Sequence, residues 1–129
     1  MHVILSAILL ALAILDLVLG TSFLVDPAGA AGDFGLAIVS THGESTLRGD
    51  MTAFFYVTAM SLAWGAWKRR PEALLPALGL FGIAFTGRFI NVIAQGPYEG
   101  WLVPMAVEAF HCLIIIVAMR AWGVQKPFA

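Results

Sequence analysis

The segment "GLFGIAFTGRFINVIAQGP" (residues 79–97) combines a long apolar run with a single charge. It is almost wholly apolar, as expected of a helix that crosses a membrane, yet Arg88 lies near its middle. A charge in hydrocarbon is costly, so intramembrane arginines face the interior of a helix bundle and pair with acidic groups. The segment therefore predicts a membrane helix that packs against other helices, with Arg88 turned toward a carboxylate.

The composition of the whole chain agrees with this prediction. Of its 129 residues, 60% are hydrophobic and only 12% are charged, which is about half the charge of an average soluble domain. The mean hydropathy is +0.91. The net charge of -1 offers no basic surface for nucleic acid. We expect one integral membrane domain whose main partner is the lipid bilayer.

Four apolar segments of about 20 residues each are long enough to cross the bilayer as helices. They cover residues 3–25, 46–67, 73–95 and 101–122. Because a backbone in lipid must satisfy its own hydrogen bonds, the predicted fold class is all-α, a single four-helix transmembrane domain over residues 1–129. The first segment is interpreted as a retained span, since a cleaved signal peptide would begin with basic residues and would not contain Asp16.

Basic residues predict the orientation of the four spans. Lys68, Arg69 and Arg70 lie between the second and third spans, and Arg120 and Lys126 follow the fourth. The first loop (26–44) and the turn at 96–100 contain no Lys or Arg. By the positive-inside rule both termini are cytoplasmic, and we expect a bacterial inner membrane.

The ionisable residues inside the predicted spans gather in the outer half of the bundle. At the rise of an α-helix, Asp16 lies about 13 Å below the outer surface, and Arg88 and Glu108 lie about 10 Å below it. The residues expected in or near this layer are Asp16, Arg48, Asp50, Arg88, Asn91, Glu108 and His111. Charges at this depth require partners, so the layer is the candidate functional site.

Two pairings are predicted within this layer. Arg88 and Glu108 come first, because the tight turn at 96–100 makes their helices neighbours and both residues lie at equal depth. Asp16 is a second candidate partner for Arg88 or for Arg48. The layer is expected to line a polar cavity that opens to the outer side, with aromatic walls formed by Phe54, Phe55, Tyr56, Phe85 and Phe89.

The leading hypothesis for function is a pocket for a small polar or amphiphilic ligand. Arg48 and Arg88 would hold an anionic or carbonyl group, and Asp16, Asp50 and Asn91 would line the pocket. The first alternative is a membrane enzyme in which Glu108 and His111 perform acid–base catalysis. The second is a structural subunit of a larger complex, in which the charges only fix helix packing. A bundle this narrow also makes a homo-oligomer an open alternative.

Three short motifs carry a resemblance to a known family. They are "FLVDP" (23–27), "ESTLRGDMTAFF" (44–55) and the "GR" at 87–88, together with Glu108 in the last span. With these features the whole chain resembles a bacterial family of small four-span membrane proteins, a domain-of-unknown-function family. The resemblance implies the fold and the membrane location, and it implies no activity.

A second likeness covers "THGESTLRGDM" (41–51), whose layout is similar to the start of the second span in haem membrane enzymes of the styrene oxide isomerase type. This resemblance implies His42 as an axial haem ligand. Arg48 stands where an asparagine is expected in that family, so the resemblance does not extend to epoxide handling.

No metal site is predicted. Glu108 and His111 have the E-x-x-H spacing of di-iron helix bundles, but those bundles carry that motif twice together with two further glutamates. Cys112 is the only cysteine, so it cannot form an intrachain disulfide, and it is interpreted as a buried, inert thiol.

Overall fold

The computed structural model describes residues 1–123, and Lys126 of the predicted cytoplasmic end lies outside them. The helices are α1 (His2–Val25), α2 (Pro27–Asp33), α3 (Thr41–Lys68), the 3-10 helix η1 (Pro71–Leu74), α4 (Leu75–Gln95) and α5 (Leu102–Gly123). The described residues contain no strand, so the predicted all-α class is confirmed.

Three helical segments are long and apolar enough to cross a membrane: His2–Val25, Pro71–Gln95 and Leu102–Gly123. α3 is the longest helix but is not one of them. Its first turns carry Glu44, Arg48 and Asp50, and Lys68 ends it. Large apolar side chains face outward on the three apolar segments, among them Val3, Ile83, Ile93 and Val103, as expected where lipid replaces water around a helix.

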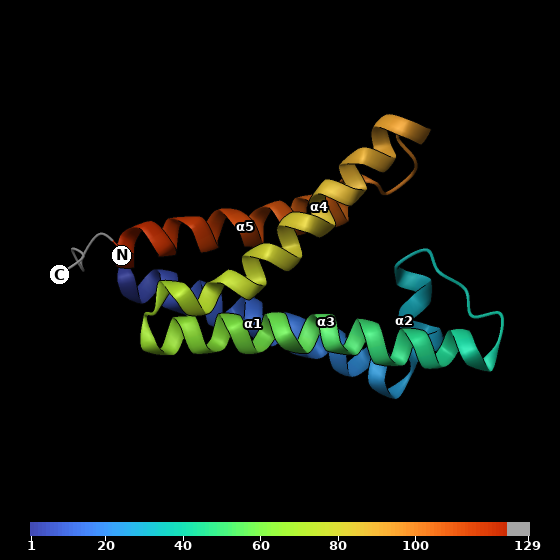
Figure 1. Ribbon diagram of the computed structural model, residues 1–129, viewed down its shortest axis with the longest axis horizontal. Coiled ribbons are helices and arrows are strands. Elements are labelled where there is room, and N and C mark those ends of the chain that lie inside the picture. Colours follow the sequence, from blue (N-terminus) through green and yellow to red (C-terminus); the bar gives the residue numbers. More distant parts are fainter. Residues whose placement is uncertain (124–129) are drawn as a thin grey trace.

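α1 and α3 lie side by side in opposite directions along most of their length (Figure 1). Gly20 allows a close approach, because a Cβ atom there would collide with the ring of Tyr56. The hydroxyls of Thr21 and Tyr56 are 2.8 Å apart, and at the other end Ser6 Oγ donates to the carbonyl of Ala66 at 3.2 Å. These contacts place residues 56–66 of α3 beside residues 6–21 of α1.

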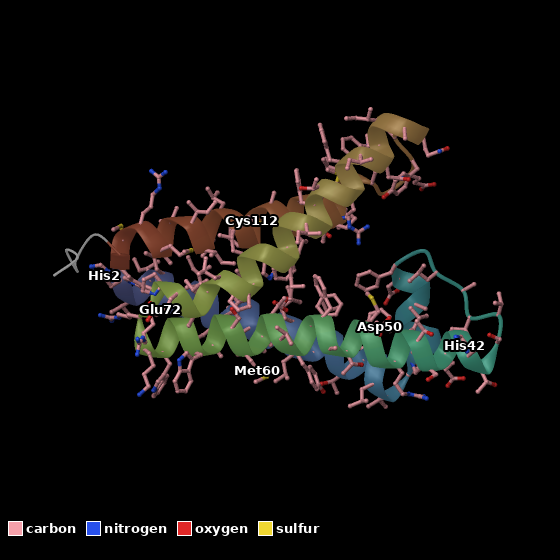
Figure 2. The ribbon with its side chains drawn as sticks, viewed as in Figure 1. His2, His42, Asp50, Met60, Glu72 and Cys112 are labelled. Carbon is pink, nitrogen blue, oxygen red and sulfur yellow. The ribbon has the colours of Figure 1, made fainter. Side chains whose placement is uncertain are left out.

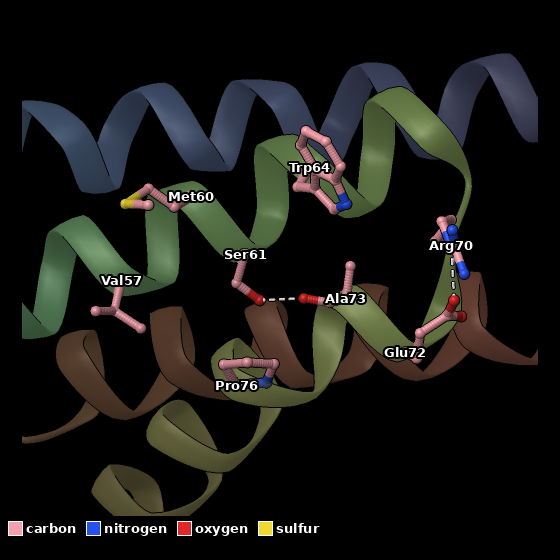
Figure 3. Close-up of a pocket in the computed structure, with 8 residues that line it drawn as sticks. All are labelled: Val57, Met60, Ser61, Trp64, Arg70, Glu72, Ala73 and Pro76. Atoms are coloured by element: carbon pink, nitrogen blue, oxygen red, sulfur yellow. Dashed lines mark hydrogen bonds and ion pairs between the residues drawn. The ribbon is translucent and has the colours of Figure 1, made fainter.

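The start of α4 is fixed to α3 by Ser61. Its Oγ donates to the carbonyl of Ala73 at 2.6 Å (Figure 3) and accepts from the backbone N–H of Ala77 at 3.2 Å. The second bond satisfies an N–H that the first turn of a helix cannot bond internally. Ala77 and Phe81 are the buried residues of α4. α4 diverges from α3 toward its C-terminal end (Figure 1). α5 packs against α4 and runs back toward the N-terminus of α1.

The larger core lies where the helices converge, near the N-terminus of α1 and the C-terminus of α5. Trp122 donates from Nε1 to Nδ1 of His2 at 3.1 Å at this end. The buried members of the core are Leu5, Leu9, Leu12, Ala13, Leu62, Ala66, Leu74, Ala77, Phe81, Ile115, Ala118 and Trp122. A smaller cluster of Phe23, Ala30 and Phe55 lies at the other end of α1, beneath α2.

The first loop contains a helix that the sequence interpretation missed. Asp26 caps α2 by accepting a hydrogen bond from the N–H of Gly29 at 3.2 Å, and Pro27 occupies the first helical position. An Asp–Pro pair is a recognised helix start, so the signal was present. α3 also begins at Thr41, five residues before the predicted start of the second span at residue 46, because Ser40 caps it through the N–H of Gly43.

Gly65 is a site where added volume has no space. A Cβ atom at this position would overlap the side chain of Leu74, which is fully buried. We expect Gly65→Ala to destabilise the protein by about 1–3 kcal/mol, although alanine is the better helix former. The measurement is thermal unfolding followed by circular dichroism in detergent micelles. Gly79→Ala is the matched control, because nothing lies within 4 Å of a Cβ there. An equal midpoint for both variants would contradict the expectation.

Candidate functional site

Four polar side chains from three helices form what we call the polar chain: Asp16 on α1, His111 and Glu108 on α5, and Arg88 on α4. α5 supplies two members because Glu108 and His111 are three residues apart and so lie on the same face of the helix. That face is the buried one, shared with Met105, Ile115, Ala118 and Trp122. The buried stripe of α5 therefore carries both the apolar core and the charges.

The predicted ion pair between Arg88 and Glu108 is confirmed. Nε of Arg88 lies 2.6 Å from Oε1 of Glu108. The Glu108 side chain is only 9% exposed, whereas that of Arg88 is 32% exposed. An arginine has five N–H donors, and this contact uses one of them. In the part of the chain that the structure describes, the terminal nitrogens of Arg88 have no partner.

The predicted pairing of Asp16 with an arginine is wrong, because its partner is His111. Oδ1 of Asp16 lies 3.2 Å from Nε2 of His111, and both side chains are completely buried. The ring of His111 lies against that of Phe81, with 4.1 Å between centroids. α1 packs against α5 and not against α4, so an arginine on α4 is out of reach of Asp16.

One oxygen of each carboxylate in the polar chain is buried without a hydrogen-bond partner among residues 1–123. These atoms are Oδ2 of Asp16 and Oε2 of Glu108, and the hydroxyl of Thr52 is in the same condition. Buried polar atoms in proteins are almost always hydrogen-bonded. Each of these carboxylate oxygens can therefore bind a proton or accept a hydrogen bond from a water or a ligand.

Arg48 makes contacts within the protein, and the ligand contact predicted for it stays a prediction. Its Nε donates to the carbonyl of Leu24 at 3.0 Å, and its Nη2 lies 3.1 Å from Oε1 of Glu44. The carbonyl of Leu24 belongs to the last turn of α1, where backbone acceptors lack partners within the helix. Arg48 thus caps α1 from α3.

The remaining predicted ligand residues are exposed. Asp50 lies in the first half of α3, and Asn91 lies in the C-terminal half of α4. The predicted aromatic residues separate into different groups. Phe55 packs with Phe23, and Tyr56 bonds to Thr21. Phe85 stacks on Phe89 with 6.3 Å between their centroids. They do not form the common wall that was expected.

Two shallow grooves are present, and neither contains a member of the polar chain. The first, of about 490 Å³, lies between α3 and the start of α4 and is lined by Val57, Met60, Ser61, Trp64, Arg70, Glu72, Ala73 and Pro76 (Figure 3). The second, of about 610 Å³, lies between α1 and α2.

His42 does not fit the role of a haem ligand. It is exposed in the first turn of α3. Figure 2 shows His42 at one end of the molecule, away from Cys112 on α5. A haem is held in an apolar cleft that limits solvent access. The described residues around His42 do not form such a cleft. Cys112 is half-buried, and no three His, Cys, Asp or Glu side chains within residues 1–123 are placed to hold a metal ion.

The comparisons with known proteins add no further assignment to this geometry. No protein-family model, curated protein or solved structure matches the chain.

Proposed function

We propose that the chain is an integral protein of a bacterial inner membrane that crosses it four times, with both termini cytoplasmic. α3 is the additional span, because its residues 56–66 lie beside α1 and so share its depth. The start of α1 lies beside the last turns of α3 and α5, which carry Lys68 and Arg120. Arg69 and Arg70 follow α3 directly. Basic residues at one end support this orientation.

Within that frame we propose that Arg88 binds the acceptor oxygen of a small amphiphilic ligand that arrives from the lipid phase. The observation that carries the proposal is the set of unpartnered N–H donors on the guanidinium. Its Nε is held by Glu108 at 2.6 Å, while its terminal nitrogens have no partner among the described residues and the side chain is one-third exposed. A guanidinium at membrane depth needs acceptors for these donors. A carboxylate, phosphate or carbonyl oxygen supplies them.

The surroundings of Arg88 favour a ligand with an apolar tail. No residue of α4 beyond Phe81 is buried. Ile83, Ile90 and Ile93 are exposed on this part of the helix. An alkyl chain that lies along this surface stays in contact with apolar atoms while its head group reaches Arg88. The ligand therefore needs no enclosed cavity.

Glu108 positions Arg88 for this contact. A carboxylate bound at Nε leaves the terminal nitrogens of the guanidinium free to face the ligand. Because Glu108 is almost fully buried, it also fixes the side chain of Arg88 against α5. The second oxygen of Glu108 is buried without a partner among residues 1–123.

The test compares two probes that differ only in the head group. We expect dodecanoate to bind the purified protein in lipid nanodiscs and dodecanol to bind at least tenfold more weakly, because charge-assisted hydrogen bonds contribute about 1.5–3 kcal/mol. Isothermal titration calorimetry measures both affinities. Arg88→Met should reduce dodecanoate binding to the level of dodecanol.

Arg120→Met is the matched control for this experiment. Arg120 is exposed in the last turn of α5, at the opposite end of that helix from the turn to α4. This variant loses the same charge and should bind dodecanoate as the wild type does. If Arg88→Met and the wild type bind dodecanoate equally, Arg88 is not the binding residue and the proposal is wrong.

A further inference from the structure

Both ring nitrogens of His111 face hydrogen-bond acceptors. Nδ1 lies 2.8 Å from the backbone carbonyl of Val107, and Nε2 lies 3.2 Å from Oδ1 of Asp16. A carbonyl oxygen can only accept, so the proton of that contact belongs to Nδ1. The tautomer of a histidine follows from such partners. Nε2 of His111 then holds no proton of its own if the imidazole is neutral.

The contact between Nε2 and Asp16 therefore requires a second proton. Without one, the lone pair of Nε2 would face the charged oxygen of Asp16 at 3.2 Å inside a fully buried site. With one, the contact is a hydrogen bond, either from a protonated imidazole to a carboxylate or from a carboxylic acid to a neutral imidazole. In both forms the pair has no net charge, which is the state that a buried site favours.

Within residues 1–123, no titratable group on the neighbouring helices is hydrogen-bonded to Asp16 or His111 in place of this contact. On α5 the titratable neighbours are Glu108, which is bonded to Arg88 of α4, and Cys112. The buried residues of α4 are Ala77 and Phe81, and Phe81 covers the imidazole ring. No buried residue of α3 is titratable. On α1, Asp16 is the only charged residue among those that are buried.

We propose that Asp16 and His111 form a proton-binding site that holds one exchangeable proton between Oδ1 and Nε2. Its ligand is a proton taken from water. Release of that proton to water leaves a neutral imidazole and a carboxylate. The pair joins α1 to α5, so the two lone pairs left facing each other would oppose the packing of these helices. This site is independent of the ligand proposed for Arg88, since it involves a different ion pair.

Nitrogen NMR of the selectively labelled histidine tests the proposal directly. In the variant H2Q/H42Q, His111 is the only histidine. Its spectrum in micelles is recorded near pH 7.5, about one unit above the reference pKa of histidine in model peptides. We expect either two protonated ring nitrogens, or one bare nitrogen together with the infrared band of a protonated carboxylic acid at Asp16. Both results place the proton in the pair.

Asp16→Asn provides the reference spectrum without that proton. An asparagine amide can donate to Nε2, so the pair keeps its hydrogen bond while its proton is fixed on the amide nitrogen. The difference in infrared absorption between wild type and Asp16→Asn isolates the acid band of Asp16 from that of Glu108. One bare ring nitrogen in the histidine variant and no acid band from Asp16 would overturn the proposal. If Asp16→Asn does not fold, aspartate labelled with 13C at its side-chain carboxyl shifts the acid band of aspartate away from that of Glu108. Two protonated ring nitrogens, or a shifted acid band, then support the proposal, and a bare Nε2 without an acid band from aspartate overturns it.

Discussion

Replacing His111 by alanine is expected to lower the free energy of unfolding by about 3–5 kcal/mol, the range found when one partner of a buried pair is removed. Asp16 is 1% exposed and would lose the only hydrogen-bond partner that its side chain has among residues 1–123. Its other oxygen is already without a partner among the described residues. The substitution also leaves a cavity beside Phe81, whose ring lies against the imidazole. Loss of pairing and loss of packing therefore act in the same direction.

The unfolding of His111→Ala can be followed by circular dichroism during denaturant titration in mixed micelles. Cys112→Ala is the matched control, because Cys112 is the next residue on α5 but is half-buried and makes no hydrogen bond among the described residues. Its replacement should cost less than about 1.5 kcal/mol. If His111→Ala lowers the free energy of unfolding by less than about 1 kcal/mol, the pair does not hold α1 against α5.

The second large effect is expected at Glu108. Glu108→Leu leaves Arg88 without its carboxylate, and we expect a loss of about 2–4 kcal/mol. The value lies slightly below that for a fully buried pair because the Arg88 side chain is 32% exposed and keeps some access to polar groups. The double variant Arg88→Met/Glu108→Leu removes both charges. It should regain most of the lost stability, since apolar replacements of a buried pair are often neutral.

A double-mutant cycle over these variants separates stability from function. The cycle uses the same unfolding measurement as His111→Ala, together with dodecanoate binding. A double variant that is nearly as stable as the wild type but has lost dodecanoate binding means that the charges serve the ligand. A double variant that is as unstable as Glu108→Leu contradicts the expected recovery. Unchanged binding of dodecanoate would leave the pair only a structural role.

The all-α class, the extent of α1 and the pairing inside one hairpin could be predicted from the amino-acid sequence alone. Long apolar segments must form helices in lipid, so the predicted first span of 3–25 differs from α1 by a single residue. Arg88 and Glu108 could be paired because the short turn between their helices fixes both their adjacency and their relative depth. α2 was missed, although the Asp26–Pro27 pair at its start is a local helix-start signal that the sequence contains.

Only the tertiary structure decided which residues of non-consecutive helices meet. The depth of Asp16 permits His111, Arg88 or Arg48 as partners, and rise per residue cannot choose among them. The choice depends on helix rotation and crossing angle, which follow from packing at sites such as Gly20 and Ser61. α4 leaves α3 after Phe81 and does not pack on α1, so Asp16 meets His111. Side-chain packing between distant segments, which no local pattern encodes, made that decision.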